Sequence, residues 1–261
     1  MKLLEAISVH ILAFKTFLDN LNHVVKTCYF HFTPDGIFIK TIDDSRTIQV
    51  ESHIPLSTFS RYSVTNNMDR IGLQINYLYK IIKEAKQTDI IEFSVNDSTP
   101  DLFDVIITHK NGGKTMSSTK FIKLNELSSR ESIFNEHAYV ISIKSSEFQS
   151  TCKKLLNMDP DEIKIVCYDQ YIEFNAEGQI NMKIEQSHLN PMYKFIRHNQ
   201  NAHSFDFTTR NIQLFSKCSS LSDEITLQIQ NDMPCMIKYE CGIGTLMLTL
   251  SPKLKTAPSK R

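Results

Sequence analysis

The sequence lacks an excess of either charge, and it lacks the cysteine spacing and the long apolar runs that mark several protein classes. Its 261 residues carry 29 basic and 29 acidic side chains, so any basic surface must be local. The six cysteines include no C-x-x-C pair, which favours reduced core thiols over a zinc site or a disulfide framework. No apolar run approaches the roughly 18 residues of a membrane span, and the first residues show no signal-peptide pattern. We therefore expect a soluble intracellular protein without metal or cofactor.

Catalytic motifs are also missing. Gly113-Lys114-Thr115 resembles the end of a phosphate-binding loop, but that pattern needs a glycine where Thr108 stands. Neither a Gly-x-Ser-x-Gly elbow nor a His-Glu-x-x-His motif is present. Asp43 and Asp44 follow a strand, as metal-binding carboxylates of nucleases can, although solubility at a strand end explains them without chemistry. We predict that the chain is not an enzyme, and a metal-dependent nuclease using this pair is the alternative from a different class.

The second half of the chain repeats the first at an offset of 134 residues. This shift aligns Leu78–Lys83 with Ile212–Lys217, and it aligns Asp89–Val95 with Asp223–Ile229. It also superposes Phe14 on Phe148, Leu21 on Leu155, Asp35 on Asp169 and Lys83 on Lys217. An offset that holds from one end of a unit to the other predicts two copies of one fold.

Hydrophobic periodicity predicts an α+β fold in which each copy reads helix, strands, helix, strands. In the first copy, an apolar stripe from Ile11 to Leu21 and the segment Asn76–Lys86 predict helices, and the expected strands are Val24–His31, Ile37–Ile42, Thr47–Ile54, Ile90–Val95, Leu102–His109 and Met116–Leu124. In the second copy, we expect helices Glu147–Leu156 and Thr209–Cys218 with strands Tyr139–Ser145, Glu162–Tyr168, Tyr171–Asn175, Gln179–Gln186, Glu224–Gln230, Cys235–Glu240 and Thr245–Leu250. The predicted domains are 1–124 and 138–252, joined by a linker at 125–137 and followed by a basic tail at 253–261.

The expected helices are basic although the chain is neutral. They carry eight basic residues against Asp19, Glu84 and Glu147. The basic residues are Lys15, Lys80, Lys83, Lys86, Lys153, Lys154, Arg210 and Lys217. Such faces at equivalent positions of a duplicated fold favour one shared binding surface over four unrelated solvated faces. Because the sequence has no recognition-helix cluster, no RNA-binding aromatic strand pair and no zinc finger, we expect contacts to phosphates that are salt-sensitive and independent of base sequence.

Several stretches resemble the proliferating cell nuclear antigen (PCNA) family of DNA sliding clamps. The C-terminal copy shows the family's order and spacing at Leu221-Ser222, Glu224–Gln230, Asp232-Met233-Pro234, Tyr239 and Leu250–Lys253. The rest of the chain does so at Asp35-Gly36, Ile42–Ser45, Tyr79–Lys83, Ser146-Glu147-Phe148 and Cys152-Lys153. It departs from the family at Asn22, Ser150 and Tyr168, where members often carry lysine or another basic residue, and in its neutral net charge. These departures indicate a divergent member, viral or parasitic.

The resemblance implies a processivity factor that encircles duplex DNA as a homotrimeric ring, with helices lining the hole and antiparallel sheets outside. It implies polymerase, clamp loader and replication or repair proteins as partners, and a location in the nucleus or at a site of viral DNA replication. By family position, the subunit interface pairs Gly113–Phe121 with Gln179–Gln186, through Lys114, Met116, Ser118, Ile180, Met182 and Ile184. A pocket for partner peptides would use Ile42, Arg46, Ile133, Phe134, Pro234, Leu250 and Pro252. A subunit of a heterotrimeric checkpoint clamp is the alternative among binding proteins.

Overall fold

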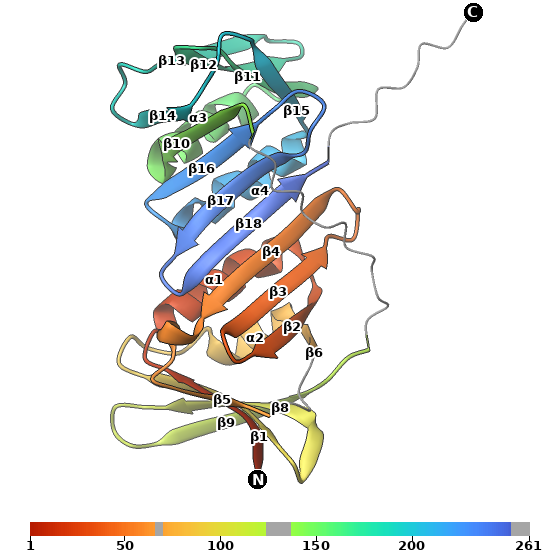
Figure 1. Ribbon diagram of the computed structural model, residues 1–261, viewed down its shortest axis with the longest axis vertical. Helices are drawn as coiled ribbons and strands as arrows, with labels where there is room; N and C mark the ends of the chain where they lie inside the picture. Colours follow the sequence, from red (N-terminus) through yellow and green to blue (C-terminus); the bar gives the residue numbers. More distant parts are fainter. Residues whose placement is uncertain (66–69, 124–136, 252–261) are drawn as a thin grey trace, which may run out of the picture. The chain divides into compact units, whose positions relative to one another are not determined.

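The computed structural model describes residues 1–65, 70–123 and 137–251, which divide into two compact units (Figure 1). Unit one contains 1–65, 70–123, 220–222 and 239–248. Unit two contains 137–219, 223–238 and 249–251. Among these residues, no helix has both the length and the apolar character that crossing a membrane requires.

Within the described residues, each copy of the predicted repeat contains two α-helices and nine strands. The first copy runs β1 (Lys2–Ser8), α1 (Ile11–Val24), β2 (Thr27–Thr33), β3 (Gly36–Ile42), β4 (Ile48–Pro55), β5 (Arg61–Val64), β6 (Arg70–Gln74), α2 (Ile75–Ile82), β7 (Ile90–Asn96), β8 (Thr99–Thr108) and β9 (Lys114–Lys120). The second runs β10 (Tyr139–Lys144), α3 (Ser145–Leu156), β11 (Glu162–Cys167), β12 (Tyr171–Glu177), β13 (Met182–Ser187), β14 (Tyr193–Arg197), β15 (His203–Phe207), α4 (Thr209–Cys218), β16 (Glu224–Ile229), β17 (Cys235–Cys241) and β18 (Gly244–Leu250). Short 3₁₀ turns occupy Leu56–Thr58 and Ser219–Leu221.

The strand order of the two copies is the same. In the first copy β1 lies between β5 and β7, and in the second β10 lies between β14 and β16. The neighbours β6–β2–β3–β4 have their counterpart in β15–β11–β12–β13. All of these pairings are antiparallel. The predictions of a duplicated α+β fold with antiparallel sheets are therefore confirmed.

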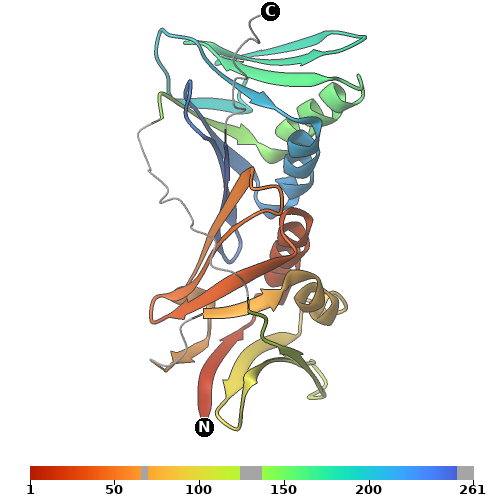
Figure 2. The ribbon, with the colours of Figure 1, turned by 90° about the vertical axis from the view of Figure 1, so that its right-hand side faces the viewer.

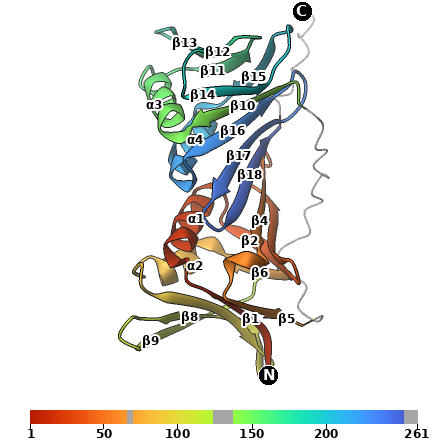
Figure 3. The same cartoon turned by 60° about the vertical axis from the view of Figure 1, so that its left-hand side comes forward.

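Within each unit the two helices lie on one side of the strands (Figures 2 and 3). Phe14 and Leu21 on α1 are buried, as are their repeat partners Phe148 and Leu155 on α3. Residues three, four and seven apart share one face of a helix, so this apolar stripe turns toward the core and leaves the basic residues outside. The repeat thus preserves both the buried and the exposed face of each helix.

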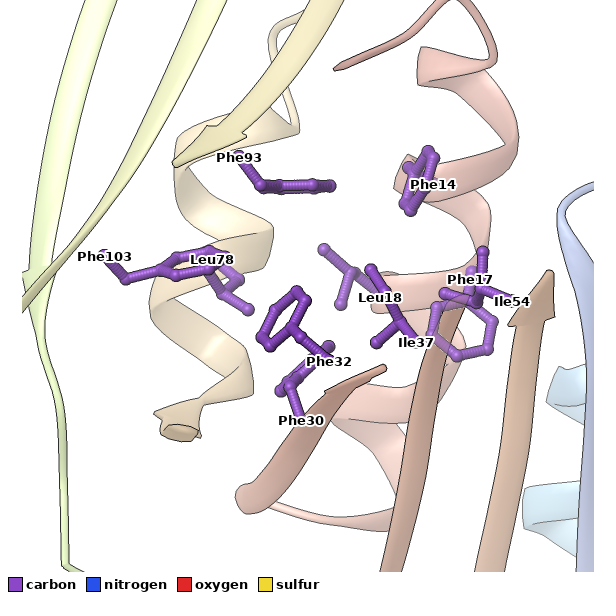
Figure 4. Close-up of a pocket in the computed structure, with 10 residues that line it drawn as sticks. All are labelled: Phe14, Phe17, Leu18, Phe30, Phe32, Ile37, Ile54, Leu78, Phe93 and Phe103. Carbon is purple, nitrogen blue, oxygen red and sulfur yellow. The ribbon is translucent and has the colours of Figure 1, made fainter. Parts of the chain in front are cut away.

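A cluster of aromatic side chains lies within the core of unit one. Phe14, Phe32, Phe93 and Phe103 point toward one another from α1, β2, β7 and β8, with Leu78 of α2 among them (Figure 4). The rings of Phe14 and Phe93 meet edge to face at 5.4 Å between centroids. The aromatic side chains and their aliphatic neighbours enclose a cavity of about 20 Å³ whose lining is apolar. Such a cavity stays dry, because a water molecule inside it would lack hydrogen-bond partners.

Several predicted boundaries were wrong. Helix α2 ends at Ile82 instead of Lys86, because the carboxylate of Asp89 accepts the Lys86 amide at 2.9 Å and closes the chain into a turn before β7. Strand β2 begins at Thr27 instead of Val24, because Val24 still belongs to the buried stripe of α1.

Both predicted interface strands were too long. Strand β9 ends at Lys120. The Phe121 amide still donates to the Asp101 carbonyl on β8, but the next amide, of Ile122, donates to the Gly72 carbonyl on β6. Strand β13 begins at Met182, because the Asn181 side chain accepts the Gly178 amide in the preceding bend. Ile180 therefore lies in that bend and not in the strand.

Five strands were not predicted: β1, β5, β6, β14 and β15. Four of them, β5, β6, β14 and β15, are only four or five residues long. Segments this short carry too few alternations to stand out from loops. Their pairing with distant strands, such as Leu4 with Val64, is what makes them strands.

Candidate functional site

The exposed faces of the helices are basic. Within their observed bounds, the four helices hold six basic residues against Asp19 and Glu147. Lys80, Lys153, Lys154, Arg210 and Lys217 are exposed, whereas Lys15 is half-buried. Helix α4 begins cleanly because the Thr208 hydroxyl accepts the Asn211 amide, and this cap fixes the first turn that carries Arg210. Two further lysines, Lys83 and Lys86, follow α2 in the chain.

Lys83 and Lys86 lie beyond the end of α2. Lys83 is exposed, with its ammonium 3.7 Å from the Glu84 carboxylate, and Lys86 is exposed in the turn before β7. The prediction that Lys86 lies on the helix was therefore wrong. An ion pair this open to solvent is weak, so Lys83 keeps most of its capacity to meet another anion.

Tyr77 is a residue of this surface that the sequence analysis missed. It is 46% exposed, and the Lys80 ammonium lies 5.9 Å from the centre of its ring. This contact is a cation–π interaction that steadies the lysine without neutralising it. The i, i+3 spacing of the two residues on a helix was the available signal.

Strands β9 and β13 form edges. β9 pairs with β8 and β13 pairs with β12, and each stands at the end of the strand order in the described part of its sheet. Lys114, Met116 and Ser118 are all exposed on β9, and Met116 is 69% exposed. Near β13, Ile180 is 59% exposed, and Met182 and Ile184 are half-buried. An edge strand with exposed apolar side chains is a template for pairing with another chain.

The residues expected to form a partner pocket fall in different parts of the chain. In unit one, Ile42 is half-buried and Arg46 is exposed with a positive φ of 57°. In unit two, Pro234 is half-buried and Leu250 is buried. Ile133, Phe134 and Pro252 lie outside the described residues.

The Asp43 carboxylate stabilises the turn between β3 and β4. It is buried at the end of β3, and its Oδ1 accepts the amides of Thr47 and Ile48, both at 2.8 Å. The Ser45 hydroxyl donates to its other oxygen. Asp44 points elsewhere and pairs with Lys26 at 3.3 Å on the exposed surface. The two carboxylates therefore fix a turn and a surface ion pair instead of converging on one site.

None of the six cysteines forms a disulfide, and five of them are buried. Burial raises the pKa of Cys152 and of Cys241 to about 12, and it raises the pKa of Cys28 and Cys167 further. Such thiols remain protonated and unreactive near neutral pH. In the described part of the chain, no group of three or more His, Cys, Asp or Glu side chains is arranged to hold a metal ion.

Two family models together cover nearly the whole chain. Proliferating cell nuclear antigen, N-terminal domain, matches residues 3–130, and Proliferating cell nuclear antigen, C-terminal domain, matches residues 134–254. The chain belongs to the PCNA family. Members of this family are DNA sliding clamps, processivity factors that form homotrimeric rings around double-stranded DNA and bind polymerase and clamp loader. They act as scaffolds and not as enzymes.

Curated PCNA relatives are similar along almost their full length. Proliferating cell nuclear antigen of Saccharomyces cerevisiae is 25% identical over 249 residues, which is 92% of this chain and 94% of the relative. That of Chaetomium thermophilum is 23% identical over the same shares. The crystal structure of Proliferating Cellular Nuclear Antigen from Entamoeba histolytica matches with a TM-score of 0.86 at 19% identity, covering 97% of this chain and 100% of that one. This likeness extends the agreement from sequence to fold.

Proposed function

We propose that the basic residues on and beside the four helices form the DNA-facing surface of this sliding clamp. The proposed contacts are Lys15, Lys80, Lys83, Lys86, Lys153, Lys154, Arg210 and Lys217. The observation that carries the proposal is that both copies of the repeat turn the apolar stripe of each helix inward and leave its cations outside. Lysine ammonium groups meet phosphates as point charges, so contacts exchange along the duplex without reading bases.

Charge reversal tests this surface. Changing Lys80, Lys83, Arg210 and Lys217 to Glu should abolish stimulation of the polymerase on primed circular DNA, because the reversed faces repel phosphates. Fold and trimer mass should persist, since these side chains are exposed. The matched control reverses Lys26, Lys40, Lys110 and Lys164, which are also exposed but lie outside the helices. Full stimulation by the helix variant, or equal loss in the control, would place the DNA surface elsewhere.

We also propose that β9 of one subunit pairs with β13 of the next in the ring. Both strands are edges with exposed or half-buried apolar side chains, which supports a contact of Lys114, Met116 and Ser118 on β9 with Met182 and Ile184 on β13. Ile180, in the bend before β13, would flank this contact. Backbone hydrogen bonds would supply affinity, and the apolar side chains would exclude water between the subunits.

For partner proteins, we propose a peptide pocket that uses Ile42, Arg46, Ile133, Phe134, Pro234, Leu250 and Pro252, by family position. Leu250 is buried, so it would pack beneath the residues that contact the peptide and would not contact the peptide itself. Apolar anchors at the centre of a small interface carry roughly 2 kcal/mol or more each. Ile133→Asp with Pro234→Asp should therefore eliminate binding of an apolar–aromatic motif peptide in calorimetry. Unchanged affinity in a folded, trimeric double variant would refute this location.

The chain has, on this proposal, no chemistry of its own, and it works in the nucleus or at a site of viral DNA replication if its source is a virus. Engagement of the Asp43 carboxylate by two amides and a hydroxyl argues against the nuclease alternative. No observation favours a subunit of a heterotrimeric checkpoint clamp.

A further inference from the structure

Exposed apolar side chains gather on β14 and on the loop before it, in unit two. Leu189 is 79% exposed, Ile196 is 64% exposed, and Met192 between them is also exposed. Three large exposed apolar side chains within eight residues are more than the scattered single ones that any soluble surface carries. This group is distinct from β9 and β13, the strands assigned to the ring.

The segment that presents these side chains is firmly held. The His188 amide donates to the Gln170 carbonyl at 2.9 Å, and the Lys144 amide donates to the Met192 carbonyl at 3.0 Å. Within the loop, the Asn190 side chain accepts the Met192 amide and donates to Gln186. These hydrogen bonds fix the loop, so the apolar side chains are held in solvent on an ordered scaffold.

Strand β14 is also an edge. It pairs with β10 from Ile143 opposite Tyr193 to Val140 opposite Arg197, and within the described residues β10 is its only neighbour in the sheet (Figures 1 and 3). The register shifts at Ile196, whose side chain is left outside the regular pairing. The far side of β14 therefore offers backbone groups next to exposed apolar side chains, as β-strand addition requires.

The charge around β14 selects the occupant. β14 itself carries Lys194 and Arg197 and no carboxylate. Of the carboxylates near it, Glu224 is paired with Lys144 and Lys194, and Asp169 is paired with His198 just after the strand. Hydrogen bonds from Lys144, Ser142 and Lys194 lower the pKa of Glu224 to about 2, so this group is ionised and already engaged. A second copy of β14 would bring Lys194 and Arg197 against like charges, whereas an acidic strand would complement them.

The equivalent strand of the first copy lacks this character. β5 contains Arg61, Tyr62, Ser63 and Val64, none of which is a large exposed apolar side chain. The guanidinium of Arg61 is paired with Glu5 at 2.6 Å. Leu56, before β5, is the one large apolar side chain exposed there among the described residues, at 45%. The apolar edge strand is therefore a property of the second copy and not of the repeated fold.

We propose that β14 and the loop before it bind an extended, acidic peptide segment of a partner protein by β-strand addition. Ile196, Met192 and Leu189 would bury its apolar side chains, while Lys194 and Arg197 would face its carboxylates. This inference does not depend on the clamp function. The surface is small, so we expect affinity in the micromolar range.

Three blocked heptapeptides test the proposal by calorimetry on the full chain. One alternates Glu and Val, a second alternates Lys and Val, and a third repeats the first with N-methylated amides that cannot pair with a strand edge. We expect the Glu–Val peptide to bind at least 10-fold more tightly than either of the others. Ile196→Asp and Lys194→Glu should each weaken it at least 10-fold, whereas Leu56→Asp and Lys164→Glu, at exposed sites outside this surface, should not.

Several outcomes would overturn it. Equal binding of the Glu–Val and Lys–Val peptides would remove the charge argument, and equal binding of the N-methylated peptide would remove strand addition. No binding, or binding unchanged in folded Ile196→Asp protein, would show that β14 is not the site. A concentration-dependent increase in the mass of the assembly that Ile196→Asp abolishes would identify a second copy as the occupant instead.

Discussion

Single side chains in this protein take their roles from their hydrogen-bond partners. Asp43 and Asp44 are neighbours of the same type, yet one is buried under two amides and the other pairs with Lys26 on the surface. Sequence placed both at a strand end but could not tell which way each side chain turns. That direction depends on the tight turn to Ile48, where Arg46 adopts a positive φ of 57°.

The two aspartates should differ in their effect on stability. Asp43→Ala leaves the amides of Thr47 and Ile48 without their charged acceptor and should lower the free energy of unfolding by about 2 kcal/mol. Asp44→Ala removes only an exposed ion pair and should change it by less than about 0.5 kcal/mol. Urea denaturation measures both. Equal losses for the two variants would contradict the assignment of Asp43 to the turn.

At the scale of elements, helices and strands differ in how far sequence predicts them. Helix α4 was predicted at its observed bounds, because its apolar period is long and Thr208 caps its start. The end of α2 was missed, since the Asp89 side chain that closes it comes seven residues later in the chain. Short edge strands such as β14 were missed because pairing with β10 defines them. Local periodicity therefore predicts a long amphipathic helix. It does not predict a helix end that a later side chain sets, or a strand that exists because of its pairing partner.

The edge strands proposed for the ring should control assembly. Met116→Glu with Ile180→Glu places carboxylates on both sides of the proposed β9–β13 contact, so the mass in light scattering should fall from about three times 30.1 kDa to 30.1 kDa. Leu56→Glu, at another exposed apolar side chain, is the control and should remain trimeric. A double variant that still forms a trimer would exclude this pairing.

At the scale of the whole molecule, the repeat is the feature that sequence conveyed best. A constant offset of 134 residues predicted two copies, and both copies share one strand order. The candidate DNA surface followed from the same repeat, because it places cations on equivalent helices. The repeat did not predict the apolar surface at β14, because that surface belongs to one copy only. Its loop is held by hydrogen bonds to residues far away in the sequence, such as Lys144.

The central claim is that this chain holds DNA by encircling it. Retention on nicked circular DNA, compared before and after cutting the circle, tests this most directly. After loading with its clamp loader and ATP, the protein should remain on the circle and should leave within the time needed to slide off once the DNA is linear. A topological link predicts this loss, because the basic contacts are individually weak and salt-sensitive. Equal retention on circular and linear DNA would contradict encirclement.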